Sequence, residues 1–299
     1  MKVGSAARPF VKKGDWIDFR TGPFFVRLET RLPELLDPFY RFYGRAVDAS
    51  AVEPFDFYVA VKPPVGLRRW FRPQVLFFLD SETPFEPFPR SHAFPLLEWG
   101  LNYAIATRAH QYCLLHSAVL ERNGRALILP ALPGSGKSTL CAALMHRGWR
   151  LLSDEFGMVR PETGELVPMP RVIPLKNRSI EVIRDFAPEA VLGPVFPGTR
   201  KGDVAHLAPT ADSLARQHEP ARPAWIVFPR FVSGAGCTLE PVADSLAFIR
   251  LSNNSFNYQL LGETAYRTLT RLVAGCERYH LEYGDLESAV VRMEALAAP

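Results

Sequence analysis

The first ninety residues alternate between short apolar runs and turn residues, a pattern typical of short strands and helices. Three runs are rich in aromatic and β-branched residues and predict strands: "FFVRLET" from Phe24, "FDFYVAVK" from Phe55 and "QVLFFLD" from Gln74. The segment "LPELLDPFYRFYG" between the first two predicts a short helix. The segment "PFEPFPRSHAFP" predicts a connector, because proline removes a backbone donor and interrupts regular elements. We therefore expect a small α+β region over residues 1–90.

Longer elements follow the connector, beginning with a helical spacing of apolar residues in "AFPLLEWGLNYAIATRAHQ". The runs "CLLHSAVLE" and "RALILPA" predict two strands joined at Asn123-Gly124, a pair favoured in hairpin turns because both residues tolerate positive φ. The run "KSTLCAALMHRG" predicts a helix that ends at Gly148. The run "WRLLSDEFGMVR" predicts a strand that is interrupted at Asp154-Glu155.

Strands and helices continue to alternate towards the C-terminus. The runs "PAWIVFPRF" and "ERYHLEYG" predict strands, and "DSLAFIRLSNN", "NYQLLGETAYRTLTRLVAG" and "DLESAVVRMEALA" predict helices. This alternation predicts an α/β domain over residues 91–299, with ligand-binding loops at the carboxyl ends of its strands.

Composition and charge narrow the classes of function. The chain of 299 residues is 47% hydrophobic and has a net charge of +4, which favours a folded protein with an anionic ligand. Lys and Arg form no run that would make a basic patch, so we expect no nucleic-acid partner. No apolar stretch approaches the roughly 18 residues of a membrane span, and the N-terminus lacks the apolar core of a signal peptide. We therefore expect a soluble cytoplasmic protein with no membrane partner.

One loop carries the clearest chemistry. The stretch "ALPGSGKST" fits the phosphate-binding pattern G-x-x-x-x-G-K-[ST], except that Ala131 holds the place of the first glycine. In such a loop the backbone N–H groups face phosphate oxygens, Lys137 reaches the β- and γ-phosphates, and Ser138 ligates Mg²⁺. A predicted strand before the loop and a helix after it match the context that the motif requires. The predicted nucleotide-binding residues are Pro133, Gly134, Ser135, Gly136, Lys137, Ser138 and Thr139.

A carboxylate pair, Asp154-Glu155, ends the strand that follows the helix of this loop. In a right-handed strand–helix–strand unit the two strands are parallel, so their carboxyl ends lie near the same phosphates. One carboxylate there can hold Mg²⁺, and the other can accept a proton from an attacking hydroxyl. A solvated turn or a helix cap is the alternative interpretation of such a pair.

The segment "LLHSAVLERNGRALILPALPGSGKSTLCAALMHRGWRLLSDEFGMV" resembles the catalytic core of bacterial HPr kinase/phosphorylase, and most closely its HPr-kinase-related branch. The segments "LLEWGLNYAIA", "PLKNRSI", "KGDVAHLAP", "NNSFNY" and "LEYGDL" extend this resemblance along nearly the whole chain. The resemblance implies a P-loop core of the HPr-kinase and phosphoenolpyruvate-carboxykinase type. It also implies an ATP- and Mg²⁺-dependent kinase that transfers the γ-phosphate to a hydroxyl, that of serine, in a protein or peptide.

The resemblance implies roles for individual residues by position. His116 matches a strand histidine near the reacting phosphate, and Lys137 and Ser138 match the phosphate-binding lysine and the Mg²⁺ ligand. Asp154 matches the acidic residue proposed as the base, so the expected catalytic residues are Asp154, His116 and Lys137. Glu155 stands where the family usually has a second Asp, which implies that Ser138 and Glu155 ligate the metal.

Two features of the family have no counterpart in the sequence. The region of residues 1–90 is short and has a pattern different from that of the family's regulatory domain. The C-terminal signature that binds HPr in the family is not found. We therefore expect an acceptor protein or peptide other than HPr, and phosphorylase activity does not carry over. The family precedent is a hexamer, which leaves a homo-oligomer open.

Two downstream segments offer positive charge to a departing γ-phosphate. The segment "PRVIPLKNRS" contains Lys176, and "PGTRKGDVAH" contains Lys201 in a glycine-bounded loop that we interpret as a mobile lid. Both lysines are expected phosphate contacts, with ordinary surface charge as the alternative. His206, at the end of the second segment, is either part of the site or a buried core histidine. The segment "SNNSFNYQ" is either a helix cap and turn or part of an adenine or partner surface.

Two other classes of function fit the same loop. A P-loop ATPase or nucleotide-gated binding module would hydrolyse or hold ATP to control a partner. A small-molecule kinase would admit a free hydroxyl compound at the polar edge of the sheet. The sequence leaves these alternatives open, together with the choice of ATP or pyrophosphate as the donor.

Overall fold

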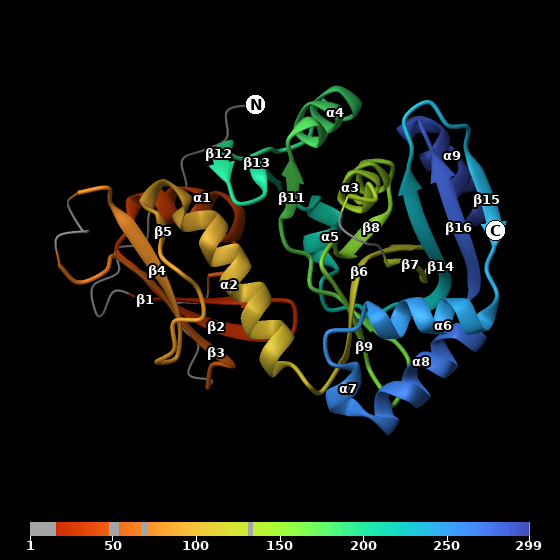
Figure 1. The fold of residues 1–299 in the computed structure, drawn as a ribbon, viewed down its shortest axis with the longest axis horizontal. Helices are drawn as coiled ribbons and strands as arrows, with labels where there is room; N and C mark the ends of the chain where they lie inside the picture. The colour runs from red at the N-terminus through yellow and green to blue at the C-terminus, as the bar shows by residue number, and fades with distance from the viewer. Residues whose placement is uncertain (1–15, 48–53, 67–70, 131–133, 299) are drawn as a thin grey trace. The chain divides into compact units, whose positions relative to one another are not determined.

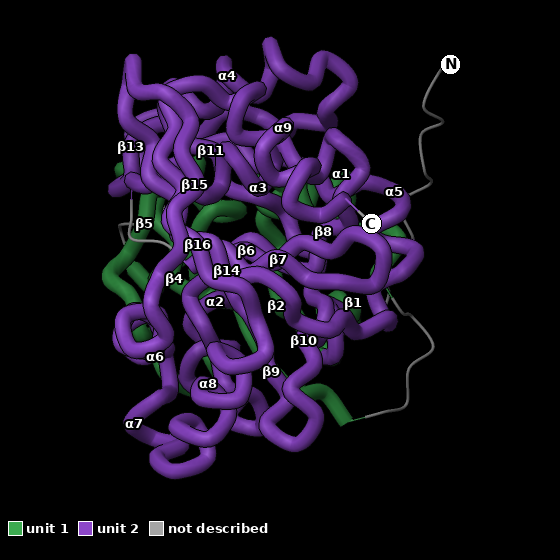
Figure 2. Tube along the Cα trace, turned by 90° about the vertical axis from the view of Figure 1, so that its right-hand side faces the viewer, with its two compact units in different colours: residues 1–20, 24–101 green, residues 21–23, 102–299 purple. Residues whose placement is uncertain are grey.

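The computed structural model describes residues 16–47, 54–66, 71–130 and 134–298. The chain forms two compact units, drawn in separate colours in Figure 2. Unit 1 comprises residues 1–20 and 24–101, and unit 2 comprises residues 21–23 and 102–299. The boundary between the units lies inside helix α2 (Ala93–Arg108), whereas the sequence suggested residue 90.

Unit 1 is built on one mixed sheet with the strand order β1-β2-β3-β4-β5. Its elements are β1 (Trp16–Thr21), β2 (Phe24–Glu29), α1 (Pro33–Tyr43), β3 (Phe57–Lys62), β4 (Gln74–Leu79) and β5 (Phe88–Pro89). The first half of α2 packs closely on β4, because a Cβ added to Gly100 would lie 2.0 Å from the Phe77 ring. The three predicted strands and the predicted helix are confirmed. Strand β1 was not predicted, and β5 lies within the predicted connector.

Unit 2 is built on a larger mixed sheet with the strand order β10-β9-β6-β7-β14-β16-β15, in which β8 also pairs with β6. Its strands are β6 (Cys113–Arg122), β7 (Arg125–Pro130), β8 (Arg150–Ser153), β9 (Phe156–Val159), β10 (Leu166–Val167), β14 (Arg222–Phe231), β15 (Thr238–Pro241) and β16 (Glu277–Tyr283). Strands β7, β14 and β16 are parallel. Strand β6 is antiparallel to both β7 and β8, so β8 runs in the direction of β7 with β6 between them. The predicted parallel orientation of these two strands is confirmed, although they are not neighbours.

Both faces of this sheet are covered by helices (Figure 1). Helices α3 (Lys137–His146) and α9 (Leu286–Leu296) pack on one face, and α6 (Asp244–Asn253) and α8 (Glu263–Gly275) pack on the other. Successive strand residues point to opposite faces, so Leu127 faces α3 whereas Ile128 faces α8. A sheet buried on both faces explains why its strands are nearly continuous apolar runs.

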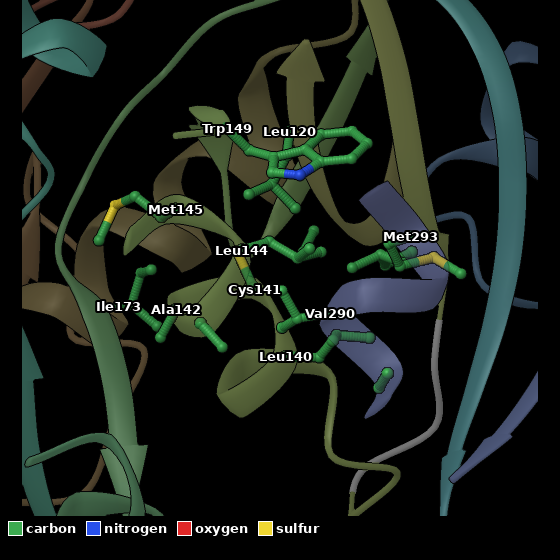
Figure 3. Packing of buried hydrophobic residues seen from close by; sticks show 14 of the residues in the cluster. Leu120, Leu140, Cys141, Ala142, Leu144, Met145, Trp149, Ile173, Val290 and Met293 are labelled. Atoms are coloured by element: carbon green, nitrogen blue, oxygen red, sulfur yellow. The ribbon is translucent and has the colours of Figure 1, made fainter. Parts of the chain in front are cut away.

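Helix α3 is enclosed on several sides (Figure 3). It contacts β6, α9, helix α4 (Arg178–Phe186) and strand β11 (Ile173–Lys176). Every residue from Leu140 to Met145 is buried, so this helix has no polar face along that stretch. Such burial holds the N-terminal end of α3 in a fixed position relative to the sheet.

A second, smaller sheet in unit 2 consists of β11, β13 (Gly202–Leu207) and β12 (Phe196–Thr199), in the order β11-β13-β12. Strands β12 and β13 are antiparallel, so the segment interpreted as a glycine-bounded loop is a hairpin with Lys201 in its turn. Its movement as a lid stays a prediction. Asn177 ties β11 to this hairpin, because its side-chain oxygen accepts a hydrogen bond of 3.0 Å from the backbone N–H of Asp203. Glycine is needed at position 202, where φ is 84° and a Cβ would lie 2.3 Å from the Asn177 oxygen.

Most helices and strands predicted for unit 2 are confirmed, but one predicted helix is two helices in the structure. The helix predicted over "NYQLLGETAYRTLTRLVAG" is split into α7 (Tyr258–Leu261) and α8, because Gly262 adopts a φ of 53° that no right-handed helix contains. The predicted hairpin at Asn123-Gly124 is present, with φ values of 55° and 77°. Within the described residues, no helix is both long and apolar enough to cross a membrane.

Candidate functional site

The carboxyl ends of several strands of the large sheet meet where helix α3 begins. Strands β7, β14 and β16 are parallel and end at Pro130, Phe231 and Tyr283. The N–H of Phe231 donates a 3.0 Å hydrogen bond to the carbonyl of Ser135, and the Tyr283 hydroxyl donates one of 3.3 Å to the carbonyl of Gly136. The loop before α3 is therefore held against two neighbouring strand ends. In open α/β sheets this edge is where ligands bind.

Two glycines shape the loop that leads into α3. Gly134 and Gly136 both have a φ of 87°, the left-handed region that side chains disfavour. A Cβ on Gly136 would also lie 2.4 Å from the Tyr283 hydroxyl, whereas one on Gly134 would meet no described atom within 4 Å. The loop conformation thus requires glycine at position 136 for two independent reasons. Ala131 and the predicted site residue Pro133 lie outside the described residues.

Lys137 and Ser138, the first residues of α3, converge on Asp154. The Lys137 ammonium donates to the Asp154 carbonyl oxygen and lies 3.4 Å from the carboxylate oxygen Oδ1. The Ser138 hydroxyl donates a 2.9 Å hydrogen bond to Oδ2 of the same carboxylate. Lys137 is 9% exposed and Asp154 4% exposed, so this junction lies in a low-dielectric environment.

Burial raises the pKa of the Asp154 carboxyl group, and the attraction of Lys137 only partly opposes this effect. For Lys137, burial acts to lower the pKa, but the charges of Asp154, Glu155 and Cys141 and the hydrogen bond with Asp154 together outweigh it, so the pKa is raised. The lysine therefore remains a cation at neutral pH. A buried cation beside a carboxylate with a raised pKa is a common arrangement at catalytic sites.

Glu155 points to a different partner from its neighbour Asp154. Its Oε1 atom lies 3.4 Å from Nε2 of His116, a residue of β6. Burial opposes ionisation of Glu155, but the hydrogen bond with His116 and the charges of Lys137 and Lys201 lower its pKa to about 2. The two adjacent carboxylates thus form two distinct centres, one with Ser138 and one with His116.

The predicted phosphate contacts Lys176 and Lys201 also belong to this electrostatic cluster. Burial and then the neighbouring charge of Lys201 lower the pKa of Lys176, while Glu155 and Asp154 act in the opposite direction. Lys176 ends β11 and Lys201 lies in the β12–β13 turn, so the small sheet contributes both cations. With Lys137, three lysines therefore interact electrostatically with Glu155. Thr139, the last predicted loop residue, donates a 3.0 Å hydrogen bond to the Ser179 hydroxyl of α4.

His206 is a core histidine and is not one of the charged groups of this cluster. It is 1% exposed, and burial and then the charge of Arg171 lower its pKa to about 3. The Arg171 guanidinium donates a 2.6 Å hydrogen bond to the side-chain oxygen of Asn102. The buried interpretation of His206 is therefore confirmed.

The segment Ser255–Asn257 extends along the first part of β6, a role that the sequence did not suggest. The Asn257 side chain accepts a 3.0 Å hydrogen bond from Leu114 N–H and donates one of 2.8 Å to the Tyr112 carbonyl. The His116 N–H donates a 2.7 Å hydrogen bond to the Asn254 carbonyl. The ring of Phe256 lies 5.4 Å from that of His116, centroid to centroid. This segment fixes the position of the strand that carries His116.

The donor atoms at this site suit Mg²⁺ bound together with a nucleotide. The hydroxyl of Ser138 and the carboxylates of Asp154 and Glu155 are hard oxygen donors, which Mg²⁺ prefers. Across the described part of the chain, no group of three or more His, Cys, Asp or Glu residues could hold a metal by itself. Mg²⁺ commonly uses one or two protein oxygens together with substrate phosphates, so the residues fit that ion.

No protein-family model matches the chain, and no curated protein matches it. The function is therefore inferred from the residues of the site and from the resemblance carried by residues 114–159.

Proposed function

We propose that this protein is an ATP- and Mg²⁺-dependent kinase of the HPr-kinase-like type, which transfers the γ-phosphate to a serine hydroxyl of a protein or peptide. The convergence of Lys137 and Ser138 on Asp154 carries this proposal. The lysine and serine come from a glycine loop at a helix N-terminus, and the carboxylate follows a strand of the same sheet. This arrangement supports nucleotide binding, since helix N-termini and glycine-loop N–H groups attract phosphate.

Each part of the loop has a defined role in binding ATP. The N–H groups from Gly134 to Thr139 bind phosphate oxygens, and Lys137 contacts the β- and γ-phosphates. The Ser138 hydroxyl and a neighbouring carboxylate hold Mg²⁺, which when bound neutralises charge on the β- and γ-phosphates. Lys176 and Lys201 stabilise the negative charge that develops as the γ-phosphate is transferred.

Asp154 accepts the proton of the acceptor hydroxyl, and its raised pKa favours this role. The geometry also supports the reverse assignment of the two carboxylates. Asp154 already accepts a hydrogen bond from the expected Mg²⁺ ligand Ser138, whereas Glu155 lies beside the titratable ring of His116. In that arrangement Asp154 holds the metal, and the Glu155–His116 pair handles the proton.

Incubation of the purified protein with γ-labelled ATP, Mg²⁺ and a lysate of the source cell tests the proposed function. We expect a labelled protein band that is absent with the Lys137→Ala variant. Release of free phosphate without a labelled band would instead identify an ATPase, and label in the small-molecule fraction would identify a metabolite kinase. An Arg184→Ala variant, altered on the exposed surface of α4, serves as the matched control.

A further inference from the structure

A cavity lies at the edge of the large sheet opposite the candidate functional site, at the amino ends of the parallel strands. Its volume is about 560 Å³, within the range of small-molecule sites. The residues that line it are Arg125, Arg222, Pro223, Ala224, Ala274, Gly275, Cys276, Glu277 and Arg278. Arg125 starts β7, whose other end leads into the nucleotide loop about 16 Å away. The cavity is therefore separate from the proposed kinase site.

Arg125 and Arg222 place two like charges side by side in this cavity. They are paired in register on the parallel strands β7 and β14. Among the described residues, no carboxylate forms an ion pair with either guanidinium. Like charges directly opposite each other on adjacent strands repel and destabilise a sheet. An anion bound between the two guanidinium groups would relieve this repulsion.

Neighbouring groups hold the walls of the cavity in place. The Arg125 guanidinium lies 4.2 Å from the centre of the buried Trp225 ring, which restricts its motion. The Arg278 guanidinium forms an ion pair of 2.7 Å with Asp244. It also donates a 2.7 Å hydrogen bond to the carbonyl of Val273, in the last turn of α8. The Glu277 carboxylate accepts a 2.7 Å hydrogen bond from the Tyr279 hydroxyl. The positive charge still available to a ligand is that of Arg125 and Arg222.

We propose that this cavity is a second binding site, which takes a small molecule bearing phosphate or carboxylate groups through Arg125 and Arg222. Guanidinium groups bind both kinds of anion through paired hydrogen bonds. The small side chains of Ala224 and Ala274 and the bare backbone of Gly275 leave space for the body of such a molecule. The proposal does not depend on kinase activity, because none of these residues belongs to the nucleotide loop.

Isothermal titration of the full-length chain with pyrophosphate and with citrate tests the proposal. The Lys137→Ala background is used in every titration, so that the nucleotide loop does not contribute. We expect saturable binding of at least one of the two anions, weakened about tenfold or more by Arg222→Ala. Arg292→Ala, which removes an exposed arginine of α9 outside the cavity, should leave the affinity unchanged. Binding of pyrophosphate alone would indicate a phosphate ligand, and binding of citrate alone a carboxylate ligand.

Two results of the titrations would overturn the proposal. One is equal affinity in the Arg222→Ala and Arg292→Ala variants, and the other is the absence of binding by both anions at millimolar concentration. Thermal unfolding without ligand provides an independent measurement. Because Arg222 faces a like charge, Arg222→Gln should unfold at the same or a higher temperature than its parent. A clearly lower unfolding temperature would mean that Arg222 stabilises the fold, and would contradict the unrelieved repulsion between Arg125 and Arg222 from which the proposal is argued.

Discussion

At the scale of single residues, the most informative feature of the site is that Asp154 and Glu155 have different partners. The two are adjacent in the chain, yet one contacts Ser138 and the other contacts His116. The sequence predicted the pair and its place after a strand. It could not predict which carboxylate faces which partner, because the chain bends between β8 and β9 at these two residues.

Substitutions of the two carboxylates separate their roles. With Asp154 as the proton acceptor, Asp154→Asn should bind ATP normally and lower the transfer rate about 100- to 10,000-fold. Glu155→Gln should have a smaller effect on the rate, because in this assignment Glu155 holds Mg²⁺ with Ser138 and does not accept the proton. Transfer rates and ATP affinities of both variants provide the measurement. A near wild-type rate in Asp154→Asn with a large loss in Glu155→Gln would reverse the assignment.

Gly136 and Gly134 form a matched pair for testing the loop. Both have a φ of 87°, so alanine at either position costs about 1–2 kcal/mol of strain. Only at position 136 would the new Cβ meet the Tyr283 hydroxyl, at 2.4 Å. We therefore expect Gly136→Ala to lower the free energy of unfolding more than Gly134→Ala, as measured by chemical denaturation. Adding Tyr283→Phe should recover part of the difference, and equal losses in the two alanine variants would show that the contact with Tyr283 is unimportant.

At the scale of elements, the hairpin of β6 and β7 could be predicted and that of β12 and β13 could not. The first turn contains Asn123-Gly124, whose positive φ values the dipeptide itself favours. The second turn contains Arg200-Lys201, which has no such preference, and the strand before it, β12, has only four residues, including Pro197 and Gly198. Their pairing depends on contacts with β11 and Asn177, which are distant in the chain. Local patterns do not contain that information.

His206 makes the stability of the small sheet depend on pH. Its folded pKa is about 3 and its ordinary value is 6.5, so below pH 6.5 the unfolded chain binds a proton that the folded chain excludes. The stabilising contribution is therefore complete above pH 6.5 and decreases by up to about 1.4 kcal/mol for each pH unit below it. His206→Asn should flatten the pH dependence of the unfolding free energy between pH 6.5 and the folded pKa of about 3. Parallel curves for the variant and its parent would contradict this origin.

At the scale of the whole molecule, the topology of unit 2 brings together residues that the sequence keeps apart. Lys176 and Lys201 come from the small sheet, Lys137 from α3 and His116 from the large sheet. The succession of β7, glycine loop and α3 was predictable, because its motif and its flanking elements are contiguous in the chain. The sequence offered both downstream lysines only as possible phosphate contacts, and it could not predict their place near the carboxylates, since that place requires the pairing of β11 with β13. The cavity lined by Arg125 and Arg222 was not predicted, because its residues come from the first residues of three strands and from the end of a helix, which are far apart in the chain.

The most direct measurement is the binding of ATP to the purified protein, with and without Mg²⁺, by equilibrium titration. We expect one ATP per chain, tighter binding with Mg²⁺, and loss of binding in Lys137→Ala. The folded state of the variant is verified by its cooperative thermal unfolding. Absence of ATP binding to the parent protein, or unchanged affinity in a folded Lys137→Ala variant, would contradict a nucleotide site at this loop and with it the proposed kinase.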